Sequence, residues 1–500
     1  MTSRFPFQLK TPDLLKTEAF VNGAWIPASS GKRFDVEDPG TGETFASCPD
    51  FDESDIEAVV RSSQEAFQHF RKENPRSRAK KLLAWDHLIR QNRDDLALVL
   101  TYEAGKPLAE AYGEIDYALG FTWWFAGEAE RVRGNVSTPA APNRRVLIVK
   151  QPIGVAAALV PWNFPIAMIL RKVGAALAAG CTMIAKPSPE TPLTCLILAN
   201  LALQAGFAPG VFNVVTTSLK NTPAVAEALC KHPNVKKVSF TGSTPIGSLI
   251  AKHCAESLKK VTLELGGNCP FIIFDDCNQD QALEALLTLK WRHAGQACIT
   301  ANRVYVQEGI YEEFLAKLVE RTKTIKLGHG ADPETKMGPL TTPRAVPKAQ
   351  AHIKDAVDGG ARVAFGGRTG SDMGLSSGYY HEPTILRDVD QSMLISREET
   401  FAPVLGLLRF STEDQVVEWA NDTSMGLASY CFTKSVDRTW RIMENLEAGM
   451  IGMNTGNSSA AESPFGGMKQ SGYGKESGKD VAVEEYLVSK TVTMTLENHY

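Results

Sequence analysis

The chain has 500 residues, of which 43% are hydrophobic and 22% charged, and its formal net charge is −4. These values are typical of a globular protein with two or three domains. The charge gives no reason to expect nucleic acid or an anionic membrane as a partner, and no run of about 18 apolar residues predicts a membrane-spanning helix.

The N-terminal segment and the cysteines indicate the compartment. The first 20 residues lack a long apolar run and contain Asp13, Glu18 and few arginines, which argues against a secretory signal or a mitochondrial presequence. The nine cysteines are scattered, odd in number and never spaced as CxxC. We therefore expect no disulfide framework, no metal site and a cytoplasmic protein.

Short, turn-rich strands open the chain, and helical patterns follow at 54–70 and 78–103. From Gly154 onward, short strand-like runs alternate with helical runs. This alternation predicts a parallel sheet with helices on both faces and with ligands at the carboxyl ends of its strands. A second alternating series from Pro270 to about Met450 predicts a second α/β domain.

Two further strand-like segments fit neither series. They are RRVLIVKQ at 144–151 and the C-terminal run VEEYLVSKTVTMTL at 483–496. We expect them to pair with each other, or with another subunit, as an appended arm.

The segment TGSTPIG at 241–247 follows a strand-like run and precedes a helix. Ser243 suits the N-cap and Pro245 the first turn, so the segment predicts an open helix N-terminus that can bind phosphate. The alternative is a plain turn between strand and helix. Helical spacing places five apolar residues on one face: Ile246, Leu249, Ile250, Cys254 and Leu258.

A cysteine, a glutamate and an asparagine are candidates for catalysis. Cys298 follows an amphipathic helix in WRHAGQAC, where a thiolate would be exposed and activated. The other eight cysteines are expected to be small buried hydrophobes. Glu264 lies in the apolar strand VTLELGG, where burial would raise the pKa of its carboxyl toward that of a general base; the alternative is a solvent-facing edge strand. Asn163 in PWNFP is a fixed amide suited to an oxyanion, or part of a rigid turn.

Together and in this order, these segments resemble the aldehyde dehydrogenase superfamily from about Ala19 to about Lys490. The matching motifs are PWNFP, KPSPETP, FTGSTPIG, LELGG, GQACITANR, EETFAPV and SPFGGMKQSGYGKE. The resemblance implies an α/β fold with a Rossmann-like NAD(P)-binding domain, a second α/β catalytic domain and a β-strand oligomerisation arm. The corresponding ranges are 1–135 with 155–266, then 267–473, and 136–154 with 474–500. A homodimer or homotetramer is implied as well.

The same resemblance assigns roles to residues. Cys298 is the nucleophile that forms a thiohemiacetal and then a thioester, Glu264 activates the deacylating water, and Asn163 binds the oxyanion with the Cys298 N–H. The cofactor-binding positions are Trp162, Lys186, Ser188, Gly242, Ser243, Glu399 and Phe401. Lys172 and Glu476 match positions linked to proton relay. The presence of Glu264 separates the chain from the CoA-acylating branch, whose members lack this base. An inactive relative that serves as a scaffold is the alternative, but it would lack at least one of the three catalytic residues.

The predicted substrate is a small acidic aldehyde. Arg171 and Arg292 match positions at which the succinate-semialdehyde dehydrogenase branch holds the far carboxylate, and Ser459 matches a substrate-contacting serine. The planar fork of arginine suits a carboxylate. We expect NAD(P)-dependent oxidation of succinate semialdehyde to succinate; the alternative is another carboxylated or an uncharged aldehyde, with structural arginines. The loop NSSAA at 457–461 is smaller and more polar than is usual in the branch, which favours a longer or different carboxylated aldehyde.

The KPSPETP motif bears on the cofactor. Pro189 stands where NAD-preferring members carry a glutamate that accepts hydrogen bonds from the adenine ribose and repels a 2′-phosphate. Its absence favours NADP, with Lys186 and Ser188 near the phosphate. Glu190, one place on, is the alternative acceptor, so NAD remains expected as well. Thr300 replaces a second cysteine found in some members, and no Cys-x-Cys redox switch is expected.

Overall fold

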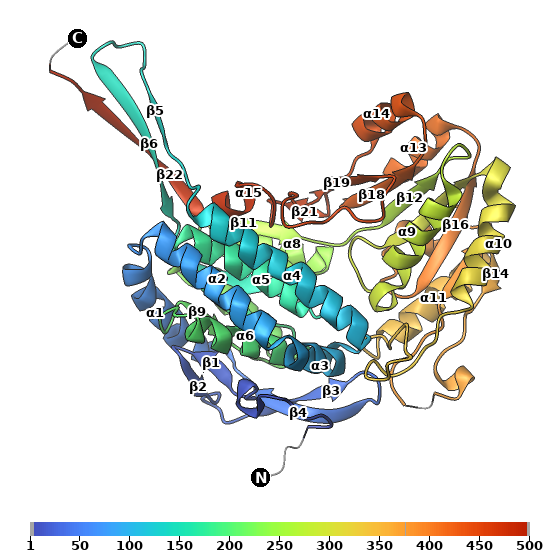
Figure 1. The fold of residues 1–500 in the computed structure, drawn as a ribbon, viewed down its shortest axis with the longest axis horizontal. Coiled ribbons are helices and arrows are strands. Elements are labelled where there is room, and N and C mark those ends of the chain that lie inside the picture. Colours follow the sequence, from blue (N-terminus) through green and yellow to red (C-terminus); the bar gives the residue numbers. More distant parts are fainter. Residues whose placement is uncertain (1–4, 376, 498–500) are drawn as a thin grey trace.

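Two large β-sheets covered by helices form the body of the molecule, and a long β-ribbon projects from it (Figure 1). The computed structural model describes residues 5–375 and 377–497. Within these residues no helix combines the length and the apolar character needed to cross a membrane.

The first sheet has eight strands in the order β2-β1-β9-β8-β7-β10-β11-β21. Their bounds are β1 (Ala19–Val21), β2 (Ala24–Ile26), β7 (Val155–Leu159), β8 (Thr182–Lys186), β9 (Phe212–Val214), β10 (Val235–Thr241), β11 (Lys260–Glu264) and β21 (Gly472–Tyr473). The five strands from β9 to β11 are parallel, which confirms the predicted parallel sheet. The chain order reverses between β7 and β10, and the crevice beyond such a reversal is where open α/β sheets bind ligands.

Helices cover both faces of this sheet. They are α1 (Glu53–Phe70), α2 (Pro75–Gln91), α3 (Arg93–Ala104), α4 (Leu108–Ala129), α5 (Pro165–Ala179), α6 (Leu193–Gln204), α7 (Thr222–Lys231) and α8 (Thr244–Ala255). Alternate residues of β7 point to opposite faces. Ala156 and Ala158 pack with α2 to α6, whereas Val155 and Ala157 pack with α1, α7 and α8.

The helical prediction for the N-terminal part was incomplete. The pattern at 78–103 forms two helices, because the chain leaves helical geometry at Asn92. Helix α4 was not predicted at all. It contains Gly113, Gly120 and Gly127, and each glycine lowers intrinsic helix stability by about 1 kcal/mol. Packing against α2 and α5 stabilises the helix in the folded chain.

The second sheet has the order β14-β15-β16-β13-β12-β18-β19, and all its strands except β14 are parallel. Their bounds are β12 (Cys269–Ile273), β13 (Ala301–Gln307), β14 (Arg362–Phe365), β15 (Thr384–Arg387), β16 (Val404–Phe410), β18 (Ala428–Phe432) and β19 (Met450–Met453). The helices are α9 (Gln279–Trp291), α10 (Tyr311–Thr322), α11 (Ala345–Asp358), α12 (Leu394–Arg397), α13 (Glu413–Asn421) and α14 (Val436–Asn445). The second α/β series is therefore confirmed.

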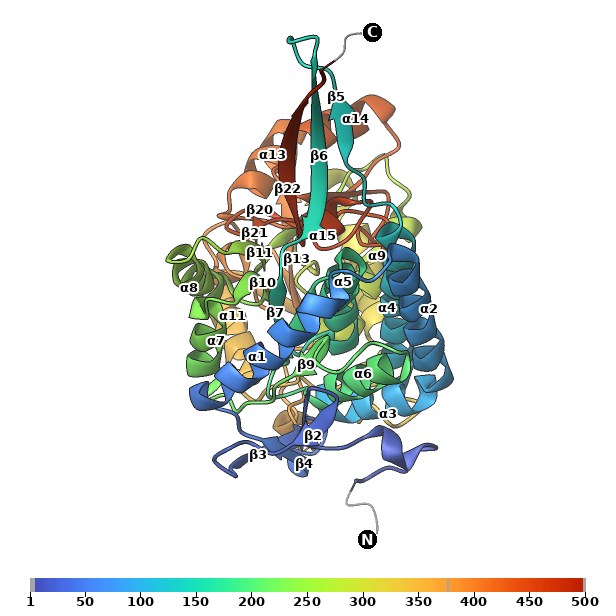
Figure 2. The same cartoon turned by 90° about the vertical axis from the view of Figure 1, so that its left-hand side faces the viewer.

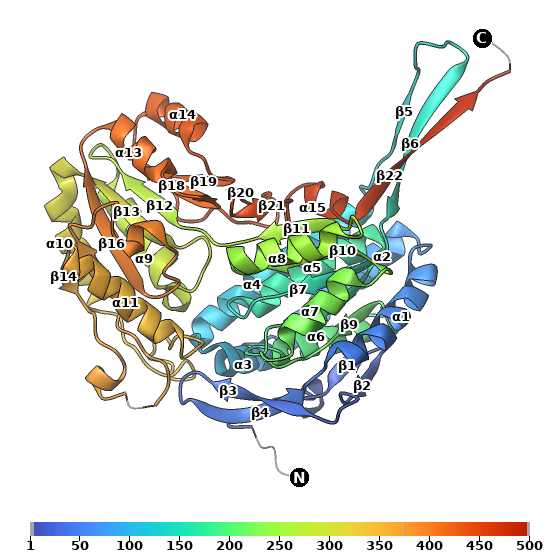
Figure 3. The same cartoon turned by 180° about the vertical axis from the view of Figure 1, so that it is seen from behind.

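The segments 144–151 and 483–496, which fit neither α/β series, pair with each other. This confirms one of the two predicted alternatives. Strand β22 (Leu487–Thr495) runs antiparallel to β6 (Arg144–Pro152) along its whole length, and β5 (Asn135–Ser137) adds a third strand. Figures 2 and 3 show this arm rising away from the body, with the short α15 (Val481–Glu484) at its base. Two small antiparallel pairs complete the structure: β3 (Arg33–Asp38) with β4 (Glu43–Pro49), and β17 (Met425–Gly426) with β20 (Met468–Lys469).

Candidate active site

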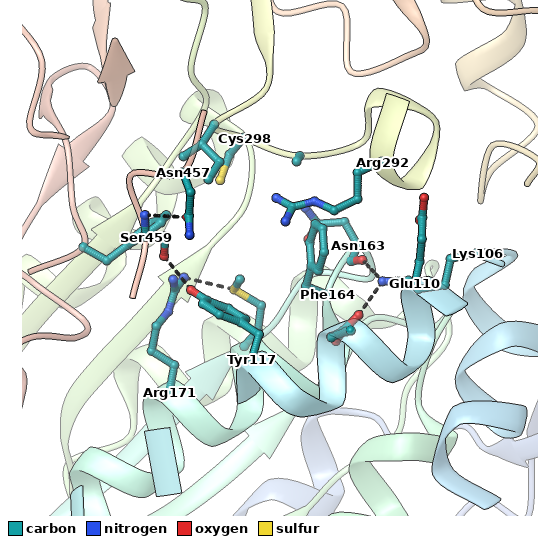
Figure 4. Close-up of a pocket in the computed structure, with 16 residues that line it drawn as sticks. Lys106, Glu110, Tyr117, Asn163, Phe164, Arg171, Arg292, Cys298, Asn457 and Ser459 are labelled. Atoms are coloured by element: carbon teal, nitrogen blue, oxygen red, sulfur yellow. Dashed lines mark hydrogen bonds and ion pairs between the residues drawn. The ribbon is translucent and has the colours of Figure 1, made fainter. Parts of the chain in front are cut away.

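A cavity of about 290 Å³ receives side chains from both α/β units (Figure 4). The loop after β7, helices α4 and α5, the turn after α9 and the loop after β19 all contribute to its wall. It brings together five residues that the sequence singled out: Asn163, Arg171, Arg292, Cys298 and Ser459. These positions are up to 296 residues apart in the chain, so only the fold unites them.

Cys298 reaches the cavity through a sharp turn. The turn Arg292–Gly295 has left-handed backbone at His293 (φ 48°), Ala294 (φ 51°) and Gly295 (φ 73°), which ends α9 and reverses the chain. All nine cysteines lie in the described part of the chain; eight are buried and Cys298 is half-buried, as expected. Burial raises the pKa of the Cys298 thiol in the protein alone, and the activated thiolate stays a prediction.

Asn163 is held from two sides. Its side-chain nitrogen donates a hydrogen bond to the carbonyl of Gln296 (3.0 Å), and its backbone carbonyl accepts one from the Lys106 ammonium (2.8 Å). An amide nitrogen carries two hydrogens, so one remains after the bond to Gln296. The side chain is thus both fixed and able to donate toward the cavity.

Glu264 is buried at the end of β11 with 1% exposure, so the solvent-facing alternative is wrong. Neither carboxyl oxygen has a hydrogen-bond partner in the described part of the chain. Burial, followed by the nearby Glu476 charge, raises the pKa of Glu264 well above its usual value. The carboxyl is not among the groups that line the cavity, although its charge acts on Cys298.

Glu476 joins two cations of α5 behind the cavity. It accepts hydrogen bonds from Arg171 Nε (3.1 Å), from the Lys172 ammonium and from the Ser239 hydroxyl (2.7 Å). Burial alone would raise the pKa of Glu476, but Lys172 and Arg171 hold it below the usual value. The Arg171 guanidinium also lies 4.0 Å from the Phe465 ring centroid. Arg171 therefore has a carboxylate partner within the protein, which it shares with Lys172.

Arg292 differs from Arg171 in this respect. Its side chain is exposed, points into the cavity in Figure 4 and lies 5.3 Å from the ring centroid of Phe164. Among residues 5–375 and 377–497 it has no ion-pair partner. The two arginines predicted to clamp the substrate both line the cavity but differ in their partners: Arg171 pairs with a carboxylate, and Arg292 has no such partner in the described chain.

Four residues of the cavity wall were missed because α4 was missed. Lys106 pairs with Glu114, whose other oxygen accepts the N–H of Ile166 (2.9 Å) at the start of α5. The Tyr117 hydroxyl shares a hydrogen bond with Ser459, and Glu110 lines the same wall. The available signal was the spacing of Glu110, Glu114 and Tyr117, which places polar groups on one face of a helix.

A second cluster lies at the carboxyl ends of the parallel strands. Trp162 follows β7 and its ring meets that of Phe401 edge-on, at 5.5 Å between centroids. Lys186 ends β8, donates a hydrogen bond to the Thr222 hydroxyl (3.0 Å), and burial lowers its pKa to about 8. Glu399 accepts the N–H of Gly267 (3.3 Å), and burial raises its pKa to about 7.

Gly242 and Ser243 lead from β10 into α8. Ser243 occupies the N-cap position and a proline lies in the first turn, as predicted, but the serine side chain makes no capping hydrogen bond. The first amides of this 12-residue helix are therefore open, as a bound phosphate requires. The predicted apolar face was partly wrong, because Ile246 and Leu249 are exposed; Gly247 is instead buried with Ile250 and Cys254, and Leu258 lies exposed beyond the helix.

Ser188 and Glu190 form a small polar group beside Lys186. The Ser188 hydroxyl donates to Glu190, and Glu190 also pairs with Arg344 (3.2 Å), a residue that the sequence did not single out. Within the described ranges, no cluster of three or more His, Cys, Asp or Glu side chains is arranged to hold a metal ion.

Comparison with known proteins agrees with this geometry. The Aldehyde dehydrogenase family model matches residues 25–492. A 3-sulfolactaldehyde dehydrogenase of Pseudomonas putida is 46% identical, over 97% of this chain and 99% of its own. Succinate-semialdehyde dehydrogenase [NADP(+)] 1 of Schizosaccharomyces pombe is also 46% identical, over 95% of both chains. The crystal structure of succinate-semialdehyde dehydrogenase from Burkholderia pseudomallei superposes with a TM-score of 0.95, at 43% identity over 98% of this chain and 100% of that one. The chain therefore belongs to the aldehyde dehydrogenase family.

Proposed function

We propose that this aldehyde dehydrogenase oxidises an acidic semialdehyde, succinate semialdehyde to succinate, with NADP or NAD. The observation that carries the proposal is the free guanidinium of Arg292 in the same cavity as Cys298. A carboxylate at the far end of the substrate supplies the partner that the described protein residues do not. The names of the relatives from Schizosaccharomyces pombe and Burkholderia pseudomallei support this substrate.

A second candidate substrate is an aldehyde with a different acidic end. The Asn457 side chain lines the cavity, and its oxygen accepts the N–H of Ser459 (3.2 Å). The amide nitrogen is thereby turned away from Ser459 and offers a further donor to the substrate. The name of the Pseudomonas putida relative, 3-sulfolactaldehyde dehydrogenase, supports this alternative.

The proposed reaction starts at Cys298. Its sulfur adds to the aldehyde carbon as the thiolate, after the thiol proton has passed to solvent. The Asn163 amide and the Cys298 N–H stabilise the oxyanion of the thiohemiacetal. A bound nicotinamide supplies the hydride acceptor. Glu264 then removes a proton from the water that hydrolyses the thioester to the acid. Lys172 and Glu476 are proposed to carry that proton onward.

The cofactor residues form a consistent set. The open N-terminus of α8, with Gly242 and Ser243, suits a pyrophosphate, and Lys186 and Glu399 would hold the two riboses. Trp162 and Phe401 would flank the nicotinamide side. Ser188 would contact a 2′-phosphate, and Pro189 carries no carboxylate, which favours NADP. Glu190, which accepts a hydrogen bond from Ser188, is the alternative acceptor that would suit NAD. Arg344 pairs with Glu190 and offsets its charge.

We also propose the following assignment of the chain to domains. Residues 1–135 and 155–266 form the NAD(P)-binding domain, 267–473 the catalytic domain, and 136–154 with 474–500 the oligomerisation element. The arm exposes Val136, Val149, Val492 and Met494, which supports burial in a homodimer or homotetramer. The free thiols support a cytoplasmic location. Light scattering coupled to size-exclusion chromatography tests the assembly.

The substrate proposal is tested by initial rates on succinate semialdehyde and on butanal, an uncharged aldehyde of the same length, each with NAD and NADP. A charged contact that only one substrate makes should favour succinate semialdehyde by at least about tenfold in kcat/KM. Equal or better use of butanal would refute the carboxylate site. It would leave the arginines with structural roles only.

A further inference from the structure

Glu110 is an acidic residue in a cavity proposed for acidic substrates, and the reaction sequence above does not use it. It lies in the first turn of α4 and lines the wall with Arg292 (Figure 4). Its carboxylate accepts the N–H of His293 (2.7 Å), in the turn that leads to Cys298. That is the one hydrogen bond its side chain makes within the described residues.

The charges around Glu110 come from three elements. Lys106 precedes α4, Glu114 follows one turn later, and Arg292 lies across the cavity in the turn after α9. Lys106 is already paired with Glu114. His293 stays neutral, because burial lowers its pKa well below the usual value. Of the cations whose charge acts on Glu110, Arg292 is therefore the one without a carboxylate partner among the described residues.

We propose that Glu110 couples the binding of anionic aldehydes to one proton. As a neutral acid it leaves the positive charge of Arg292 to the substrate, and as a carboxylate it offsets that charge and repels the substrate. Burial raises the pKa of Glu110 to about 7, although the hydrogen bond from the His293 N–H and the charges of Lys106 and Arg292 lower it. Both forms are thus populated near neutral pH. The inference rests on the proposed function, since it concerns the same substrate site.

The direction of the pH dependence follows from the linkage between substrate binding and protonation of Glu110. A bound anion favours the protonated form of Glu110, so substrate binds most tightly below pH 7 and progressively more weakly above it. At most, affinity falls tenfold per pH unit, which is the limit for a single proton. The effect levels off once the ionised form also binds measurably.

The test is the ratio of kcat/KM for succinate semialdehyde to that for butanal, measured from pH 6 to pH 8.5. Titration of Cys298 and Glu264 affects both aldehydes and cancels in the ratio. We expect the ratio to fall at least about fivefold over this range in the wild type. In Glu110→Gln it should stay flat at its acid value, because the amide oxygen still accepts the His293 N–H but carries no charge.

Calorimetry gives a second measurement that does not depend on turnover. Succinate binding at pH 7.5, in buffers of different ionisation enthalpy, should take up a proton in the wild type and none in Glu110→Gln. A flat wild-type ratio, or an equal fall in Glu110→Gln, would overturn the role of Glu110 while leaving the substrate proposal intact. A ratio near one at every pH would instead overturn the substrate proposal.

Discussion

Replacing each cavity arginine by methionine separates recognition from stability. Arg292 contacts the Phe164 ring and no carboxylate among the described residues, and its side chain is exposed. Arg292→Met should therefore lower the free energy of unfolding by no more than about 0.5–1 kcal/mol. It removes a charge-assisted contact to the substrate that is worth about 1.5–3 kcal/mol. The loss in kcat/KM for succinate semialdehyde should then be about 10- to 150-fold.

Arg171→Met is the matched comparison, since it removes the same group from the same cavity. Arg171 is 1% exposed and bonded to Glu476, which is also buried. Removing one partner of a buried ion pair costs about 3–5 kcal/mol, because the remaining charge is left without full compensation. Lys172 still pairs with Glu476 and compensates its charge, so the loss should lie at or below the lower end of that range, about 3 kcal/mol. Activity toward both aldehydes should decline together.

The assay measures kcat/KM for succinate semialdehyde and for butanal. It also measures the midpoint of unfolding, the concentration of guanidinium chloride at which half of the protein is unfolded. Arg292→Met should change the ratio of the two aldehydes and leave the midpoint nearly in place, whereas Arg171→Met should shift the midpoint. The reasoning fails if Arg292→Met costs succinate semialdehyde less than threefold, or costs butanal as much. An unchanged midpoint in Arg171→Met would refute the argument from the buried pair.

Three further variants test the remaining roles. Glu264→Gln should slow steady-state turnover about 10²- to 10⁴-fold, because hydrolysis of the thioester loses its base. The first hydride transfer should persist as a burst of reduced cofactor, and mass spectrometry should find a thioester on Cys298. The absence of this burst would contradict the deacylation role. Asn163→Ala should lower kcat about 10²- to 10³-fold with the dissociation constant for NADP unchanged, because it removes an oxyanion donor; weakened NADP binding would point to a structural role. Pro189→Glu should raise the dissociation constant for NADP at least about tenfold and leave that for NAD within threefold, measured by tryptophan fluorescence; equal changes would show that this position does not face the 2′-phosphate.

The sequence predicted the repeating part of the fold well. The alternation of apolar strands and amphipathic helices after Gly154 reflects burial of a parallel sheet on both faces, and the structure confirms it. Local patterns sufficed here because the periodicity of a buried element is written into consecutive residues. The burial of Glu264 was one of two alternatives that the sequence left open, since β11 also contains Lys260 and Thr262.

Other features were decided by tertiary structure. Helix α4 has three glycines and forms through packing on α2 and α5. Helix propensity therefore did not predict α4, and its cavity residues Glu110 and Tyr117 were missed. Arg171 and Arg292 look alike in sequence, but a carboxylate 305 residues away forms an ion pair with the first, while no carboxylate in the described chain pairs with the second. Likewise, the raised pKa of the Cys298 thiol results from its burial in the folded chain. Local patterns in the sequence fix the chemical groups that are available and the layers that hold them. Contacts between distant segments determine which charges are paired and which remain for a substrate.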